Sequence, residues 1–266
     1  MDPAAPRIEW KGVAAAIAES ERNEVVIGAA VIAPSGERFS HNGSRRFVAA
    51  STVKVPLMIA LFHEIEAGRG QLTDLLRLGA ADRAPGSGVL LHLHEGIELT
   101  IGDLVYLMIS ISDNTATNVL IDRVGMERVG KVMQALGMWK STLERRMQGH
   151  AALPGAAENW ATPDDYAEMM RALFAHTAAS PASSAAMIGY LEKQQNPRRI
   201  ARFLPRSNGP RWGSKTGSVP GVVNDVGFIE TRRGMLILSL FCETDDPHLG
   251  EQTIGEISRA ALAAVG

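Results

Sequence analysis

Strand-forming segments stand near both ends of this 266-residue chain, and the long stretch between them carries almost only helical patterns. Near the N-terminus, Glu24–Ala33 is an apolar, β-branched run that ends at Pro34, and a short partner strand is expected near residues 37–40. After Trp212 strand patterns return, at 219–230 and 235–242. This order predicts one sheet assembled from both ends of the chain, with an all-helical lobe inserted between them.

The remaining segments predict helices. The first 20 or so residues and residues 251–265 have helical patterns, and these terminal helices would cover the sheet. Within the inserted stretch, Thr100 and Asp103 resemble a capping box, and Thr162 followed by Pro163 marks another helix start. The sequence therefore predicts an α+β fold.

Composition narrows the possible partners. The chain has 27 Lys and Arg against 29 Asp and Glu, with no long run of one sign, so we expect no nucleic-acid partner and no polybasic membrane patch. Its single cysteine, Cys242, allows no internal disulfide and no thiolate metal cluster, and we expect neither a metal nor a cofactor. Residues 1–21 lack a leader-like apolar run and no segment is apolar enough to span a bilayer, so we expect a cytoplasmic protein.

The first chemical motif is Ser51 followed by Lys54, at the start of an amphipathic stretch. Three residues of separation on a helix place both side chains on one face, where an amine can reach a hydroxyl. A lysine whose pKa is lowered by burial can take the proton of a serine and make it a nucleophile. The alternative is a capping serine beside a solvated lysine.

A second motif, Ser112-Asp113-Asn114, falls in the break between two apolar helices. Small polar residues at such a break often form a cap. They can also present a hydroxyl that relays a proton, from Ser112, and an amide that binds a substrate amide, from Asn114.

The third motif, Lys215-Thr216-Gly217, is expected to open the strand that contains Val219. The lysine and threonine could bind an anionic group, and the glycine would let a substrate lie against the strand edge. A phosphate-binding loop is rejected, because Ser214 stands where glycine should precede the lysine and a strand follows where a helix is required.

These three motifs, in this order, resemble the penicillin-recognising serine enzymes of the class A β-lactamase family. The likeness covers about residues 24–245 and includes SDNTATNVLI at 112–121 and the pair Asn224-Asp225. It implies a three-layer αβα fold with an antiparallel sheet of about five strands. Residues 1–50 with 206–266 would form the sheet lobe and 51–205 the helical lobe, as one unit with the active site between them.

The resemblance also implies roles for the reacting groups. Ser51 would be acylated, Lys54 would be its base or proton relay, and Ser112 would pass a proton to the leaving nitrogen.

Binding roles are implied in the same way. Asn114 would hold the side-chain amide of the substrate, and Lys215 with Thr216 would hold its carboxylate. The backbone N–H groups of Ser51 and Ser218 would form the oxyanion hole.

Two positions depart from the family pattern. The glutamate that activates the deacylating water is replaced by Met147, and among the acids of that loop Glu158 is the possible substitute. Many class A enzymes also place an arginine for the substrate carboxylate where this chain has Val223, and Arg198 and Arg202 are only loose substitutes.

The expected function is a serine hydrolase that forms an acyl-enzyme on Ser51 and acts on a small-molecule β-lactam or a related amide or ester. One alternative is a cytoplasmic transacylase, esterase or peptidase that uses the same acyl-serine. Another is a penicillin-binding module with little turnover. The oligomeric state is left open.

Overall fold

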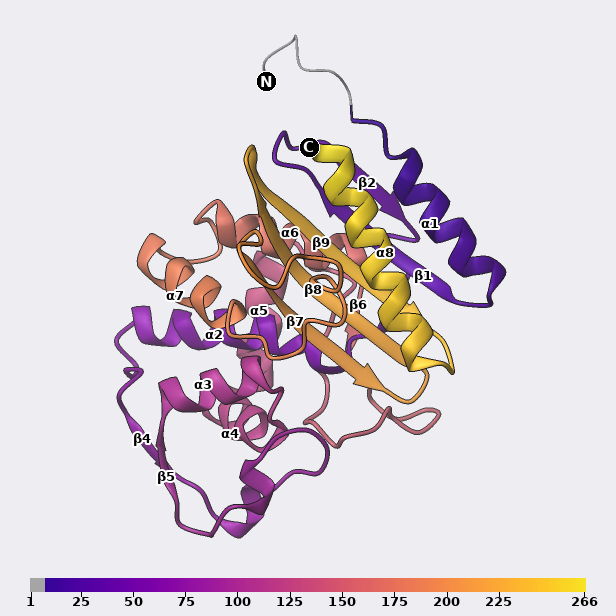
Figure 1. Cartoon of the computed structure of the whole chain (residues 1–266). Coiled ribbons are helices and arrows are strands. Elements are labelled where there is room, and N and C mark those ends of the chain that lie inside the picture. Colours follow the sequence, from indigo (N-terminus) through magenta and orange to yellow (C-terminus); the bar gives the residue numbers. More distant parts are fainter. Residues whose placement is uncertain (1–7) are drawn as a thin grey trace.

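The computed structural model describes residues 8–266, and its centre is a five-stranded antiparallel sheet with the strand order β2-β1-β9-β8-β7 (Figure 1). The first two strands come from the N-terminal part of the chain and the other three from the C-terminal part, which confirms the sheet that the sequence predicts. The strands are β1 (Val26–Ile32), β2 (Arg38–His41), β7 (Trp212–Val219), β8 (Val222–Thr231) and β9 (Gly234–Glu243).

Helices cover both faces of this sheet. The terminal helices α1 (Lys11–Arg22) and α8 (Pro247–Val265) lie side by side on one face, and α6 (Pro163–Phe174) packs on the other (Figure 1). Alternating side chains of β1 feed the two cores, because Ile27 and Val31 pack toward the terminal helices and Ile32 packs toward the helical lobe. The three-layer arrangement is therefore confirmed; the part of the expected N-terminal helix at residues 1–7 lies outside the described residues.

The inserted stretch is mainly helical. Its helices begin where the sequence places caps, since Thr100 accepts from the N–H of Asp103 and Thr162 precedes Pro163 at the first turn of α6. Besides α6, the α-helices of this lobe are α2 (Lys54–Glu66), α3 (Ile101–Ser110), α4 (Asn114–Val124), α5 (Met126–Ala135) and α7 (Pro181–Leu191). Short strand pairs interrupt it: β3 (Phe47–Val48) with β6 (Trp160–Ala161), and β4 (Leu75–Arg77) with β5 (Glu98–Thr100).

One expected boundary is wrong. Lys215, Thr216 and Gly217 do not open the strand of Val219–Glu230; they lie inside β7, which a two-residue turn at Pro220 and Gly221 separates from β8. The strand boundary was predicted too late because the sequence of β7 is polar, contains glycines and lacks an apolar alternation. It lacks this alternation because β7 is an edge strand that faces the helical lobe and the site instead of a continuous core.

Within residues 8–266, no helix combines the length and apolarity needed to cross a bilayer. Cys242 is buried in β9, and burial raises the pKa of its thiol to about 12. A thiol in this state remains protonated at neutral pH and packs as a small apolar group.

Candidate active site

The serine of the first motif lies in a tight turn between β3 and α2. Ser51 belongs to the 3-10 helix η1 (Ala50–Val53), and Lys54 begins α2 directly after it. Side chains three residues apart eclipse each other in a 3-10 helix, so the amine of Lys54 and the hydroxyl of Ser51 lie on the same side. Ala50, just before the serine, has the left-handed φ of 47°, a strained conformation of the kind that clusters at functional sites.

This turn rests on the paired strands β7 and β8. The side-chain amide of Asn224 donates to the carbonyl oxygens of Val48 and Ala49, at 2.9 and 3.3 Å. Opposite it, Gly217 has no side chain, and a Cβ placed there would stand 3.0 Å from the Ala49 oxygen and 3.2 Å from the Ser51 nitrogen. The sequence predicts that this glycine lets a substrate lie against the strand edge. In the structure, the turn that contains Ser51 instead occupies the space where a side chain of residue 217 would lie.

Lys54 joins the first and second motifs. Its ammonium nitrogen, fully buried, donates to the Ser112 carbonyl oxygen at 2.8 Å, to Ser112 Oγ at 3.0 Å and to Asn114 Oδ1 at 2.8 Å. Burial lowers the pKa of Lys54 well below its usual value, the charge of Lys215 lowers it further, and Asp113 opposes this shift. A lysine with this surrounding can be neutral and take a proton, as a general base must.

The second motif caps a helix and contacts Lys54. Asp113 is the N-cap of α4, accepting from the N–H of Ala116, and its other oxygen accepts from the N–H groups of Val89 and Leu90. Ser112 is held in the left-handed region at a φ of 61°, where its hydroxyl meets Lys54. The cap interpretation therefore applies to Asp113, and Ser112 and Asn114 are held in contact with Lys54.

Lys215 of the third motif is fully buried in β7, and its amine donates to the Thr216 carbonyl oxygen at 2.8 Å. Burial lowers its pKa to about 7, with a smaller contribution from Arg199, while the carboxylate of Asp225 opposes the shift. Because Lys215 also lowers the pKa of Lys54, the first and third motifs are electrostatically coupled.

The free edge of β7 offers a hydrogen-bond donor beside the nucleophile. Val219 and Val222 flank the two-residue turn and form the closing hydrogen-bonded pair of the hairpin. The next pair, Ser218 with Val223, is then a non-hydrogen-bonded pair, so the Ser218 N–H points away from β8. The sequence reasoning assigned this N–H group to the oxyanion hole, and the register leaves it available.

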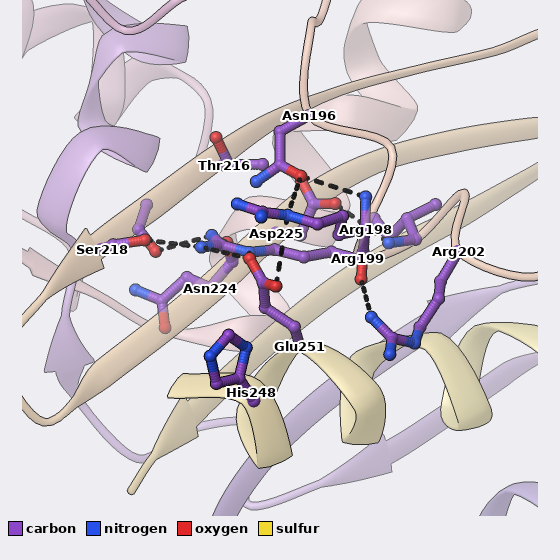
Figure 2. Close-up of polar contacts among 12 residues, drawn as sticks. Asn196, Arg198, Arg199, Arg202, Thr216, Ser218, Asn224, Asp225, His248 and Glu251 are labelled. Atoms are coloured by element: carbon purple, nitrogen blue, oxygen red, sulfur yellow. Dashed lines mark hydrogen bonds and ion pairs between the residues drawn. The ribbon is translucent and has the colours of Figure 1, made fainter. Parts of the chain in front are cut away.

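Arg199 is the functional residue that the sequence reasoning missed. Its buried guanidinium donates to the carbonyl oxygens of Gly217 at 2.9 Å and Asn224 at 2.7 Å, and to Ser218 Oγ at 2.6 Å, and it pairs with Glu251 of α8 (Figure 2). The loose substitutes proposed from the sequence stay outside: Arg198 is exposed and pairs with Glu251, and Arg202 is exposed. Three arginines in one loop carry no periodic pattern, so the sequence offers no signal for which of them turns inward.

The loop at 143–162 closes the other side of the site. Arg145 pairs with Glu158, at 2.8 Å from Nε to Oε1, and the carboxylate also accepts from the N–H groups of Ala152 and Asn159. Glu158, the possible deacylation base, is thus engaged by several donors that hold the loop together. Met147 is fixed through its backbone, because the Asn118 side chain accepts from its N–H at 2.8 Å and donates to its carbonyl oxygen at 3.0 Å.

These segments enclose one small cavity of about 50 Å³ against the nucleophile. Predicted site residues from four parts of the chain meet on its wall: Ser51, Asn114, Glu158 and Ser218. Met147 lines it as well. Its volume corresponds to one or a few water molecules.

Comparison with known proteins gives the family. The model of a family described as the beta-lactamase enzyme family matches residues 11–265. The chain belongs to the beta-lactamase enzyme family. It is a serine hydrolase of the class A group, as the three motifs implied.

Individual relatives agree with this membership. A beta-lactamase from Sphaerobacter thermophilus, known from its crystal structure, shares 60% sequence identity with this chain. The two structures superpose with a TM-score of 0.95, and the match covers 97% of this chain and 98% of that one. A beta-lactamase of Rhodobacter capsulatus is 30% identical over 87% of this chain and 80% of its own length. The structure of PBP-A is 25% identical, with a TM-score of 0.85 over 95% of each chain.

Proposed function

We propose that this beta-lactamase family member hydrolyses β-lactams through an acyl-enzyme on Ser51. One observation supports the assignment of residues. The buried Lys54 amine donates to Ser112 and Asn114, and Ser51, three residues before Lys54, lines one cavity together with Asn114. The comparisons favour hydrolysis over the transacylase, esterase and peptidase alternatives.

The acylation half of the reaction uses the groups in contact with Lys54. Neutral Lys54 takes the proton of Ser51, whose oxygen attacks the lactam carbonyl carbon. The N–H groups of Ser51 and Ser218 stabilise the negative charge that develops on the carbonyl oxygen. As the C–N bond breaks, the leaving nitrogen takes the proton of Ser112 Oγ, which recovers one from Lys54 across 3.0 Å.

The groups along β7 would bind the carboxylate of the substrate. Thr216 and Ser218 share one face of the strand, and the Arg199 guanidinium donates to Ser218 Oγ at 2.6 Å (Figure 2). Lys215 contributes a second positive charge whenever it is protonated. Arg199 therefore supplies the cation that the sequence lacks at Val223.

The decisive experiment combines intact-protein mass spectrometry with the absorbance change of a chromogenic cephalosporin. Rapid colour change without a lasting adduct is expected for hydrolysis that is not limited by deacylation. A stoichiometric adduct on Ser51 that persists would assign the protein to β-lactam capture with little turnover. Neither adduct nor colour change would contradict the proposed substrate class.

A pH profile tests the role of Lys215. Its pKa of about 7 means that the charge is present below this pH and is lost above it. For a carboxylate-bearing β-lactam we expect kcat/KM to fall as pH rises from 6 to 8, because one of the two cations at the carboxylate disappears. Lys215→Arg, which stays charged, is expected to remove this decline. A native profile that is flat from pH 6 to 9 would contradict the assignment.

A charge-balanced double variant tests Arg199. Replacing Arg199 alone would leave the buried Glu251 with only the exposed Arg198 as its partner. The comparison is therefore made between Glu251→Gln and the double variant Arg199→Gln with Glu251→Gln. Removal of the guanidinium is expected to lower kcat/KM for a carboxylate-bearing substrate about 10- to 100-fold, the usual size of a charge-assisted hydrogen bond. A substrate esterified at that carboxylate serves as the control and should respond little. Equal losses for both substrates would indicate a purely structural role.

A further inference from the structure

The replacement of the expected glutamate by Met147 leaves open which group activates the water that releases the acyl product; the question presupposes the acyl-enzyme proposed above. Such a group must border the space next to the acylated serine. The cavity against Ser51 is that space, and its wall includes five polar side chains from the loop at 143–162: Arg145, Gln148, His150, Glu158 and Asn159.

Four of these five side chains cannot readily accept a proton. Arg145 offers only hydrogen-bond donors, and Gln148 and Asn159 are neutral amides. The Gln148 side-chain oxygen accepts from Arg145 at 3.0 Å, and the Asn159 side-chain oxygen accepts from the N–H groups of Glu144 and Arg145. Glu158 is surrounded by donors, because Oε1 accepts from Arg145 Nε and Asn159 N, and Oε2 accepts from Ala152 N and Arg145 Nη2. These four bonds use the lone-pair sites of the carboxylate, so none is left to accept from a water molecule.

His150 differs from them. Its Nδ1 lies 2.7 Å from the carbonyl oxygen of Ala151, and since a carbonyl oxygen can only accept, Nδ1 must carry the hydrogen. The neutral ring therefore has its lone pair on Nε2. Imidazole with an open nitrogen is the side chain best suited to general-base catalysis near neutral pH.

The backbone around His150 is fixed in place. Arg145 donates to its carbonyl oxygen. Gly149, at a φ of 77°, packs on Gly86 of the neighbouring loop, where an added Cβ would come within 3.1 Å of the Gly86 Cα. The charged groups on this wall are Arg145 and Glu158, which pair with each other, while Gly86, Ser87 and Asn114 on the facing segments do not titrate.

We propose that His150 is the general base of deacylation. Nε2 takes one proton from a water molecule, and the water oxygen forms a bond to the acyl carbon. When the bond between that carbon and Ser51 Oγ breaks, the serine oxygen recovers the proton from the imidazolium. The cycle consumes one water and leaves both side chains in their starting protonation states.

The test follows the decay of the acyl adduct. The native protein is loaded with a penicillin, excess ligand is removed, and the adduct mass is monitored over time. His150→Gln is expected to slow decay about 100-fold, the lower end of what a general base contributes, while the rate of acylation changes less than threefold.

The chain provides a matched control. His94 is also exposed, and its Nδ1 lies 3.0 Å from the carbonyl of the following residue, but it is not among the residues that line the cavity. His94→Gln should leave decay unchanged. In His150→Gly, added imidazole should restore decay, a response that a structural role of the ring would not produce.

The outcomes separate this inference from the proposed function. An adduct on Ser51 whose decay is the same in the native protein and in His150→Gln overturns the role of His150 alone. Slower decay in Glu158→Gln but not in His150→Gln overturns it in favour of the carboxylate. A native adduct that does not decay at all overturns it too, and the absence of any adduct refutes the acyl-enzyme itself.

Discussion

Ser51→Ala is expected to abolish both the covalent adduct and the turnover of a chromogenic cephalosporin, with kcat reduced by at least about 10⁴-fold. The reason is that no acyl-enzyme can form without the hydroxyl, and loss of a catalytic nucleophile has effects of this size in serine hydrolases. Adduct formation is measured by intact mass, and turnover by absorbance.

A fold defect must be excluded for this variant. Ser51 is half-buried and alanine suits the turn, so the Tm should stay within a few degrees of the native value. Thr52→Ser is a neighbouring control that keeps the hydroxyl bonded to the Ala49 carbonyl oxygen and leaves the nucleophile untouched. Persistence of adduct in Ser51→Ala would show that another residue is acylated, and the site as built above would be wrong.

Met147→Glu is expected to shorten the lifetime of the acyl-enzyme by about 100-fold. The Asn118 side chain bonds both the N–H group and the carbonyl oxygen of Met147. Met147 lines the cavity that Ser51 also lines. A carboxylate introduced there gains access to water next to the acyl carbon and supplies a second general base. Adduct decay by mass spectrometry, under conditions of a single turnover, measures the gain.

Met147→Gln provides the matched comparison, because it has nearly the same size as glutamate and cannot take a proton. We expect its adduct to decay at the native rate. The methionine side chain is partly buried against the core, so both variants should lose similar stability. Equal decay in the glutamate and glutamine variants would mean that the cavity does not give the side chain access to the hydrolytic water.

Local signals in the sequence predicted much of the fold. The caps at Thr100 and Thr162 lie where expected because they depend on hydrogen bonds within three residues, which the sequence specifies directly. The β-branched run at Glu24–Ala33 likewise contains β1. By contrast, the strand character of Trp212–Val219 depends on pairing with β8 and on contact with the nucleophile turn, and no local pattern reports either.

The candidate site divides in the same way. The order and chemistry of the three motifs predicted which residues would line a shared cleft, and Lys54, Ser112 and Asn114 are indeed in contact. Which arginine faces inward depended on the packing of a loop against β7 and α8, and Arg199 was therefore missed. The pairing of Glu158 with Arg145 likewise depends on the folded loop, which brings together two residues that are 13 positions apart in the chain.

The sequence by itself determined the family and the layered fold, and it supplied the residues proposed as nucleophile, base and relay, because each motif consists of particular residue types at short spacing. The tertiary structure decided the electrostatics of the site. The pKa values of Lys54 and Lys215 are lowered by burial and by a nearby positive charge from a distant part of the chain. That charge is Lys215 for Lys54 and Arg199 for Lys215. Desolvation and charge proximity are properties of space, and they exist only once the two lobes have closed on each other.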